Sequence, residues 1–403
     1  MPGGEADEMP QGIHGLQATS HVPFGNIYQM LTNGRVYNFS PGPAMLPDPV
    51  MVRIKEEFLN YGGLGASVIE ISHRAKDFVA IVDGATSLFR ELTGLPADYS
   101  VLFVAGGGRM QFSAVPLNLI GRSPSRKALY VETGVFAANA IKDAAAYGDI
   151  RVLASSRDTG FDRIPAIDPA AVDQDASYVH ITTNNTVYGS RWNKFPDTGA
   201  VPLVGDQTSE ILSRVIDYSR FGVIYAGLQK NLGPSGSALV VIRKDLLGQA
   251  LPITPLLLNY ASVDKGNSLV NTPSTFNIYV TWLVLQWLKE QGGVAAIEAV
   301  NERKAKTVYD VIDASSFYKG VVQPAHRSRM NITFHLPSEE LLGQFLKGAA
   351  KEGLSSLKGY RDVGGVRASI YNAMPLEGAQ ALAAYMTELI SGKSGHKGVG
   401  FQL

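Results

Sequence analysis

The sequence predicts an α/β protein, in which a mainly parallel sheet covered by helices on both faces is followed by a smaller α+β domain. Between residues 100 and 243, short β-rich apolar runs alternate with helical patterns, as in sheets built from strand–helix units. After about residue 290 the pattern changes to long helices around one alternating strand, MNITFHL, in which Ile332, Phe334 and Leu336 share a face. The chain has 403 residues, of which 45% are hydrophobic, enough to bury two cores.

The first 35 residues contain glycines, prolines and polar residues without sustained periodicity, so we expect an irregular extension. Glu5, Asp7 and Glu8 argue against a secretory signal and against an organelle transit peptide. A segment that wraps a partner subunit is the alternative to a disordered one.

A helix is expected from residue 48, after several turn signals in VYNFSPGPAMLPDPV. Asp48 is the predicted N-cap and Pro49 the first helical residue. Val50, Ile54 and Phe58 then fall at four-residue steps, which places them on one apolar face.

Six apolar runs predict strands of the large sheet, namely VLFVA, ALYVE, YVHITT, VPLVGDQ, VIYAG and ALVVIR. Ligands bind to open parallel sheets beyond the carboxyl ends of the strands. Residues 106–109, Thr186, Asp206 and Lys230 would all lie there, although they are far apart in the sequence. The sequence therefore predicts one site built from four segments.

Lys230 and Asp206 are the residues that indicate a chemistry. Lys230 follows an apolar run and lies in the glycine-rich loop GLQKNLGPSG, and Asp206 ends another apolar run. Pyridoxal phosphate needs a lysine that forms a Schiff base and a carboxylate that keeps its pyridine nitrogen protonated. A single loop lysine is more often a solvated surface charge, so the assignment depends on other motifs.

One such motif is VLFVAGGGRMQFSAVPLNLI, which predicts a buried strand, three glycines and the start of a helix. Backbone N–H groups and the helix dipole favour an anion there, Gly106 to Gly108 let a phosphate approach, and Arg109 adds a charged contact. The run matches neither the Walker nor the dinucleotide pattern, which favours a small phosphate group over a nucleotide. Tight strand–helix packing is the alternative role of the glycines.

The composition excludes several classes of function. Lys+Arg and Asp+Glu both number 36, so nothing indicates a nucleic acid or an anionic membrane as a partner. There is no cysteine, and the seven histidines show no close metal-ligand spacing, so we expect no metal site. No apolar run approaches the ~18 residues of a membrane span, and we expect a cytoplasmic protein.

Together the motifs resemble those of the phosphoserine aminotransferases, a family of fold-type I pyridoxal-phosphate enzymes. The likeness covers nearly all of residues 36–390 and rests on NFSPGPAMLP, EISHRAKDF, GGGRMQFSAVPLNL, NNTVYG, the segment around Asp206, GLQKNLGPSG, NTPSTF and KGYRDVGGVRASIYNAMP. It implies a large domain at residues 48–290 with a mainly parallel sheet of seven strands and a small domain at residues 291–403. Residues 36–47 would pack with the small domain, after the extension at residues 1–35.

The resemblance also implies roles for individual residues. Lys230 would be the Schiff-base lysine and Asp206 the partner of the pyridine nitrogen. Arginine suits the anionic groups of cofactor and substrate because its planar fork donates two parallel hydrogen bonds. The cofactor would further be held by Gly108, Arg109, Phe136, Thr186 and Gln229, and by Asn271 and Thr272 of the neighbouring subunit of a homodimer. The substrate would be bound by Tyr360, Arg361 and Arg367, and by His73 and Arg74 of the neighbouring subunit.

Two residues depart from the family pattern. Phe136 replaces a tryptophan that stacks on the cofactor ring, and it keeps the aromatic face but lacks the indole N–H. Tyr360 replaces a histidine beside the substrate phosphate, and a tyrosine brings no positive charge at neutral pH. Taken singly, His73 could also be a helix-capping residue, and Arg361 and Arg367 could be ordinary surface charges.

The implied activity is reversible amino transfer between L-glutamate and 3-phosphooxypyruvate, a phosphorylated 2-oxo acid, in serine biosynthesis. 4-Phosphooxy-L-threonine, of vitamin B6 synthesis, is a second candidate product. Two alternatives stay open, another fold-type I aminotransferase such as an alanine–glyoxylate type, and a noncatalytic cofactor-binding relative. His73, Arg74 and Arg361 argue against the first, because an uncharged substrate side chain would leave their charges unneutralised. Lys230 and Asp206 argue against the second.

Overall fold

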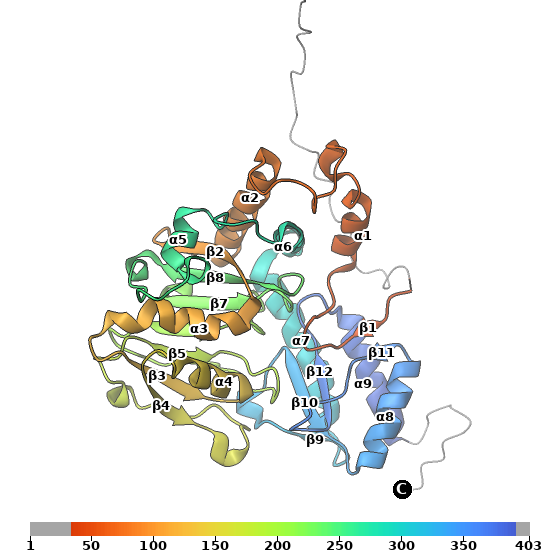
Figure 1. The fold of residues 1–403 in the computed structure, drawn as a ribbon. Coiled ribbons are helices and arrows are strands. Elements are labelled where there is room, and N and C mark those ends of the chain that lie inside the picture. The colour runs from red at the N-terminus through yellow and green to blue at the C-terminus, as the bar shows by residue number, and fades with distance from the viewer. Residues whose placement is uncertain (1–33, 392–403) are drawn as a thin grey trace, which may run out of the picture.

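A seven-stranded sheet forms the centre of the structure, a computed structural model that describes residues 34–391 (Figure 1). The strand order is β2-β8-β7-β6-β5-β3-β4. β8 is antiparallel to both of its neighbours and the other pairs are parallel, so the predicted mainly parallel sheet is confirmed. The strands are β2 (Tyr99–Ala105), β3 (Lys127–Glu132), β4 (Asp149–Ser155), β5 (Val179–Thr182), β6 (Leu203–Asp206), β7 (Val223–Gly227) and β8 (Ser237–Arg243).

Strand β4 was not predicted from the sequence patterns. It is an edge strand that pairs only with β3, and its residues are exposed or half-buried. An edge strand with solvent on its open side does not need the continuous apolar run that marks a covered strand. Its sequence, DIRVLAS, therefore lacks the signal that identified the other six.

Helices cover both faces of the sheet, as predicted. Phe103 belongs to the hydrophobic cluster of one face and Val104 to that of the other. Because successive strand residues point to opposite faces, a continuous apolar run such as VLFVA supplies both clusters. The first face carries α2 (Lys76–Thr93) and α6 (Thr275–Glu290), and the second carries α3 (Gly107–Leu119), α4 (Val135–Ala144) and α5 (Tyr260–Lys265).

The helix predicted from residue 48 is α1 (Asp48–Glu57), but the predicted cap is wrong. The residue before it holds the N-cap position and Asp48 is the first helical residue. The Asp48 carboxylate pairs with Arg35, and no side chain caps the helix. Val50 is buried on the predicted face, whereas Phe58 lies at the helix end and is 38% exposed.

A three-stranded antiparallel sheet, in the order β12-β10-β9, forms the centre of the C-terminal part. Ile332 and Phe334 of the predicted alternating strand are fully buried in its hydrophobic cluster. Near the N-terminus, β1 (Tyr37–Asn38) pairs in parallel with β11 (Leu354–Ser355), and Phe39 joins the same cluster. The other elements here are α7 (Gly293–Asp313), β9 (Lys319–Gly320), β10 (Asn331–His335), α8 (Glu339–Lys351), β12 (Val366–Ser369) and α9 (Leu376–Ile390).

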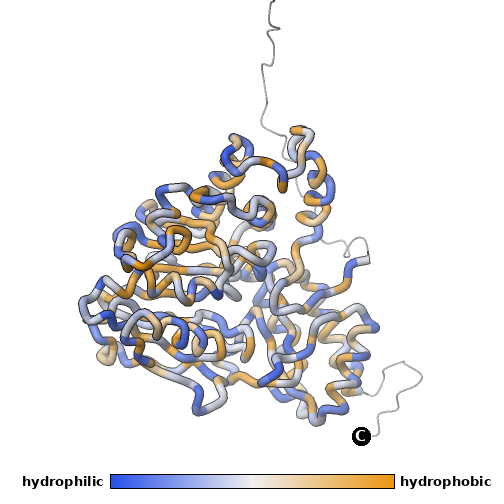
Figure 2. The backbone as a smooth tube through the Cα atoms, viewed as in Figure 1, coloured by the Kyte–Doolittle hydropathy of each residue, from blue (hydrophilic) through white to orange (hydrophobic). Residues whose placement is uncertain are grey.

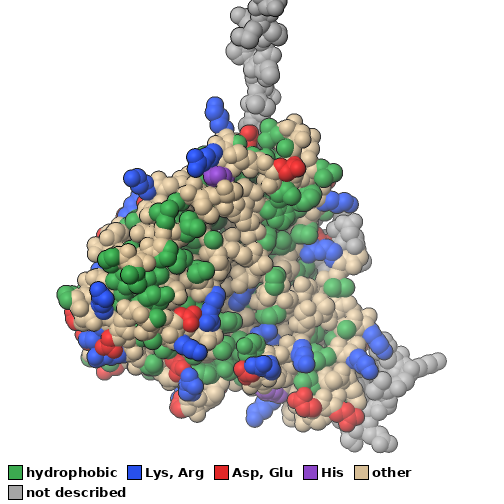
Figure 3. All heavy atoms as spheres, viewed as in Figure 1, with side chains coloured by type: hydrophobic (Ala, Val, Ile, Leu, Met, Phe, Trp, Pro, Cys, Tyr) green, Lys and Arg blue, Asp and Glu red, His purple; other side chains and the backbone are tan. Residues whose placement is uncertain are grey.

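The domain boundaries near residues 47 and 290 stay predictions, and residues 1–33 of the predicted extension lie outside the described residues. Hydrophobic residues concentrate along the central strands in Figure 2. On the face in Figure 3, cationic and anionic side chains are interspersed, and hydrophobic side chains gather on the side that carries α3 and α5. Within residues 34–391, none of the helices combines the length and the apolar character that crossing a membrane requires.

Candidate active site

A cavity of about 300 Å³ lies at the carboxyl ends of the parallel strands, where the sequence predicted a site. This volume is at the lower end of the range typical of small-molecule pockets, ~300–1,000 Å³. Loops that follow β2, β5, β6 and β7 contribute to its wall. The predicted site residues that line it are Gly108, Arg109, Phe136, Thr186, Asp206, Gln229, Lys230, Tyr360 and Arg367.

Lys230 lies on the loop after β7 and is 7% exposed. Its Nζ donates a hydrogen bond to Thr186 Oγ1 at 2.5 Å and lies 5.6 Å from the centre of the Phe136 ring. The pKa of Lys230 is lowered to about 7, mainly by burial; the charge of Asp206 opposes this shift and the charge of Arg367 adds to it. A large fraction of this lysine is therefore the neutral amine at neutral pH, the form that attacks a carbonyl carbon or removes a proton.

The lowered pKa of Lys230 makes the stability of the ligand-free protein depend on pH. Between pH 7 and pH 10.5 the unfolded chain keeps a proton that the folded state has released from this lysine, so the free energy of unfolding rises with pH. Since one pKa unit corresponds to about 1.4 kcal/mol, we expect a contribution of about 2 kcal/mol between pH 7 and pH 9. This contribution is measured by urea unfolding of the wild type and of Lys230→Met at pH 7 and at pH 9. An equal pH dependence in the two proteins would contradict the prediction.

Asp206 ends β6 and is 6% exposed. Its Oδ1 accepts a hydrogen bond from the Thr208 backbone N–H at 3.0 Å. Burial raises the pKa of Asp206, whereas hydrogen bonds from Thr208 and Tyr225 and the charge of Lys230 act in the opposite direction. The carboxylate is therefore a buried acceptor for a cationic N–H group inside the cavity.

Helix α3 begins at the cavity, directly after β2. No side chain caps its N-terminus, where Gly106 adopts a left-handed φ of +87°. A Cβ at Gly108 would lie 2.8 Å from Thr208 Oγ1, so the close approach of the first turn of α3 to the loop after β6 favours glycine here. Uncapped backbone N–H groups at a helix start favour an anion. The Arg109 side chain is 57% exposed and pairs with Asp143 at 3.1 Å, so it lies at the mouth of the cavity rather than inside it.

Arg367 in β12 and the nearby Tyr360 approach the cavity from the C-terminal part of the chain. Arg367 is 7% exposed, and its Nε has no hydrogen-bond partner among residues 34–391. Burial lowers the pKa of Arg367, as expected for a cation withdrawn from water. A buried guanidinium with an unpaired N–H is a receptor for an anionic ligand group.

The remaining predicted residues do not line this cavity within one chain. Arg74 is exposed, and its Nε donates to His73 Nε2 at 3.3 Å in the segment before α2. Asn271 and Thr272 are exposed and line a separate pocket. The side chain of Arg361 is 90% exposed and pairs with the neighbouring aspartate. The roles predicted for these residues stay predictions.

Sequence patterns missed several residues that line the cavity, among them Gly42 and Thr208. Gly42 has a φ of +135°, and a Cβ there would lie 3.3 Å from Lys230 Cγ, so a side chain would crowd the lysine. Its position between two prolines in NFSPGPA was the available signal. Thr208 Oγ1 accepts a hydrogen bond from the Gly227 N–H at 3.2 Å and so joins the loops after β6 and β7. Its spacing two residues after Asp206, typical of a local side-chain-to-backbone turn, was the signal.

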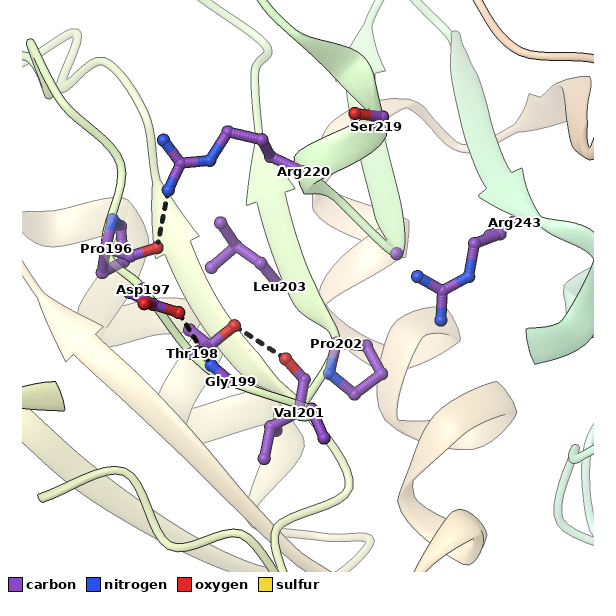
Figure 4. Close-up of a pocket in the computed structure, with 12 residues that line it drawn as sticks. Pro196, Asp197, Thr198, Gly199, Val201, Pro202, Leu203, Ser219, Arg220 and Arg243 are labelled. Atoms are coloured by element: carbon purple, nitrogen blue, oxygen red, sulfur yellow. Dashed lines mark hydrogen bonds between the residues drawn. The ribbon is translucent and has the colours of Figure 1, made fainter. Parts of the chain in front are cut away.

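A second cavity, of about 260 Å³, lies at the amino ends of β6 and β7 (Figure 4). Its wall consists mainly of residues 196–203 with Arg220 and Arg243. Arg220 donates to the carbonyl of Pro196 at 3.3 Å, and Arg243 pairs with Asp245 at 2.6 Å. None of the predicted site residues lines it, and the described part of the chain holds no group of three side chains suited to a metal ion. The cavity around Lys230 is therefore the candidate active site.

Comparisons with known proteins identify the family. The model of the class-V aminotransferases matches residues 36–382. A phosphoserine aminotransferase of Bacillus cereus is 50% identical over 354 residues, which are 88% of this chain and 98% of that protein. The solved phosphoserine aminotransferase of Bacillus circulans subsp. alkalophilus is 43% identical, with a TM-score of 0.86 over 89% of this chain and 99% of that one. Another, from Trichomonas vaginalis with PLP bound, is 35% identical, with a TM-score of 0.83 over 88% of this chain and 100% of that one. The chain therefore belongs to the class-V aminotransferase family, among the phosphoserine aminotransferases.

Proposed function

We propose that this protein binds pyridoxal 5′-phosphate in the cavity around Lys230 and transfers the amino group reversibly between L-glutamate and 3-phosphooxypyruvate. The products are 2-oxoglutarate and O-phospho-L-serine. The observation that carries the proposal is the buried pair of Lys230 and Asp206, an amine and a carboxylate in one cavity of a chain of this family. The absence of cysteine fits the cytoplasmic location that we also propose.

The residues of the cavity fit the parts of this cofactor. The uncapped start of α3 suits its phosphate, and the buried carboxylate of Asp206 suits a protonated pyridine nitrogen. When bound, the cofactor supplies an electron sink for the carbanion formed at the substrate. Gly108, Arg109 and Gln229 would hold its phosphate, Asp206 the ring nitrogen, Thr186 the ring hydroxyl and Phe136 a ring face, with Asn271 and Thr272 of a second subunit reaching the phosphate.

Lys230 would accept and return the proton at the substrate Cα. Its pKa of about 7 places the neutral amine within the working range of a general base at neutral pH. The hydrogen bond to Thr186 orients Nζ, and the surrounding loops keep the amine out of bulk water. A tethered base with a matched pKa needs no diffusional encounter with the substrate.

Arg367 would bind the substrate α-carboxylate, since its buried Nε lacks a partner within the described chain. Tyr360 and Arg361, with His73 and Arg74 of a second subunit, would bind the distal carboxylate or phosphate. Glutamate and O-phosphoserine both carry two anionic ends on a short chain, so one cationic pocket serves both substrates. The same reasoning makes 4-phosphooxy-L-threonine a second candidate product.

The active unit that we propose is a homodimer. His73, Arg74, Asn271 and Thr272 lie outside the cavity of their own chain, as expected if they complete the site of a neighbour. Hydrophobic side chains gather on the α3–α5 side in Figure 3, and Ile253 is 71% exposed. Exposed apolar surface of this kind is typical of subunit interfaces.

Mixing two impaired variants tests whether the site is shared. In a hybrid dimer of Lys230→Ala and Arg74→Ala, one site carries both changes and the other carries neither. Random assembly from equal amounts should therefore restore about a quarter of the wild-type rate, because half of the dimers are hybrids with one intact site each. The amino-transfer rate of the mixture, compared with each unmixed variant, gives the result. Hybrid dimers without any gain in rate would contradict the shared site.

An amino-transfer assay with a panel of donors tests the proposed function. With added cofactor, O-phospho-L-serine and 2-oxoglutarate should form glutamate, and 4-phosphooxy-L-threonine in the same assay measures the second candidate. Amino transfer from L-alanine to glyoxylate should be far slower than transfer from O-phospho-L-serine to 2-oxoglutarate. Rapid transfer from alanine alone would favour the alanine–glyoxylate alternative, and a bound cofactor without any transfer would favour a noncatalytic relative.

A further inference from the structure

Two buried polar side chains, His180 and Tyr225, lie near Asp206 on the two strands that flank β6. Asp206 in β6 pairs with Tyr225 in β7, and His180 lies on the other neighbour, β5, opposite Val204. His180 is 1% and Tyr225 is 0% exposed. The Tyr225 hydroxyl lies 2.9 Å from His180 Nε2, and it is close enough to the Asp206 carboxylate to lower the pKa of that group as a hydrogen-bond donor. The three side chains therefore lie in series from the imidazole to the cavity.

The chemistry of the three groups gives this chain one direction. An ionised carboxylate can only accept hydrogen bonds, so the Tyr225 O–H donates to Asp206. The single phenol proton is then used, and the same oxygen must accept from His180, which therefore carries its proton on Nε2. The remaining ring nitrogen, Nδ1, is buried without a hydrogen-bond partner in the described chain. A bare Nδ1 lone pair agrees with this tautomer, whereas an N–H in that place would be an unpaired buried donor.

The surroundings of His180 keep it neutral. Burial lowers the pKa of His180 to about 3, and its ring stacks on Tyr130 at 4.7 Å between centres and 19° between planes. The other titratable groups that face the chain are Tyr178, Tyr260 and Lys230. Burial raises the pKa of the three tyrosines Tyr130, Tyr178 and Tyr260 well above 10, so between pH 5 and pH 9 only Lys230 changes its charge nearby.

We propose that His180 and Tyr225 are positioning residues for Asp206, which donate in series, imidazole to phenol to carboxylate, and so hold that carboxylate ionised and turned toward the cavity. The inference rests on the proposed role of Asp206 as partner of the cofactor's ring nitrogen. Burial alone disfavours a charged carboxylate at this position. A neutral donor chain offsets that cost without adding a positive charge that would compete with the ring nitrogen.

A pair of matched variants and two cofactors test the proposal. Tyr225→Phe removes only the hydroxyl that lies between His180 and Asp206. Tyr178→Phe is the control, because its hydroxyl is equally buried but bonds to Tyr130 at 2.8 Å. Binding of pyridoxal phosphate is compared with that of its 1-deaza analogue, in which a carbon replaces the ring nitrogen, through the dissociation constants at equilibrium.

Tyr225→Phe should weaken binding of pyridoxal phosphate roughly tenfold or more and leave binding of the deaza analogue nearly unchanged, since a hydrogen bond to a charged group is lost only where the ring nitrogen uses that charge. Tyr178→Phe should leave the ratio of the two dissociation constants, for pyridoxal phosphate and for the deaza analogue, unchanged. An equal loss for both cofactors in Tyr225→Phe, which a merely structural role predicts, or no loss for either, would overturn the proposal.

The tautomer is measured independently in the ligand-free protein by ¹⁵N NMR of labelled histidine, assigned with a His180→Asn variant. We expect a neutral ring with its proton on Nε2 from pH 5 to pH 9. A proton on Nδ1, or protonation of the ring in this range, would overturn the donor chain. Failure of wild type to bind pyridoxal phosphate would instead refute the proposed function, and the NMR result would still decide whether the chain exists.

Discussion

Replacing Lys230 with alanine should lower kcat by at least ~10⁴-fold, because it removes the amine that we propose as both the nucleophile and the general base of the reaction. The folded state should not be weakened. The side chain is 7% exposed and its burial lowers the pKa to about 7, so its removal relieves a cost at neutral pH. Steady-state kinetics, with a thermal unfolding curve of the same sample, measures both effects. Methylamine, which fits the space that the shorter side chain leaves, should restore part of the rate.

Lys289→Ala is the matched control for this experiment. Lys289 is an exposed lysine of α6 that pairs with Glu91 at 2.7 Å, and exposed ion pairs of this kind contribute about 0–1 kcal/mol. Its replacement should leave kcat unchanged. Appreciable turnover by Lys230→Ala without added amine would show that another group carries out the proton transfer.

Replacing Arg367 with methionine should produce effects of opposite sign on catalysis and on stability. Loss of the bidentate contact proposed between Arg367 and the substrate α-carboxylate should reduce kcat/KM for both glutamate and O-phosphoserine by ~30-fold or more, since losing one partner of a buried charge pair costs about 2–5 kcal/mol. The ligand-free protein should become more stable, because Arg367 is buried and its Nε has no partner within the described residues. Steady-state kinetics and urea unfolding of the same preparation measure the expected decrease in kcat/KM and the expected increase in the free energy of unfolding.

Arg214→Met provides the contrast. Arg214 is also largely buried, but it pairs with Glu210 at 2.9 Å and donates to the Trp192 carbonyl at 2.7 Å. Its replacement should lower stability by leaving Glu210 unpaired and should change kcat/KM little. A loss of stability in Arg367→Met comparable to that in Arg214→Met, or a loss of kcat/KM for only one substrate, would contradict the role assigned to Arg367.

The sequence predicts those parts of the fold and the site whose signal is local. A covered strand needs a continuous apolar run, so six strands were found, and edge strand β4 was missed because solvent relaxes that requirement. Asp206 was found because it ends an apolar run, and Lys230 because it lies in the glycine-rich loop that follows another. Parallel strands bring their carboxyl ends to one edge, which is why these residues line the same cavity.

Other features depend on contacts that no local pattern encodes. His180 and Tyr225 lie inside the apolar runs YVHITT and VIYAG, where they are indistinguishable from core residues until the strand pairing sets them beside Asp206. Arg367 is separated from Lys230 by more than one hundred residues, and only the resemblance singled it out. The roles proposed for His73 and Arg74 involve a second chain, so the contacts of a single chain do not display them.

The visible absorbance of the protein loaded with pyridoxal 5′-phosphate tests the proposed activity most directly. O-Phospho-L-serine, added without any 2-oxo acid, should remove the absorbance band of the bound cofactor. 2-Oxoglutarate should then restore the band and form one glutamate for each site. A band that persists with both O-phospho-L-serine and glutamate would contradict amino transfer, and a band that responds to glutamate but not to O-phospho-L-serine would contradict the assigned substrate.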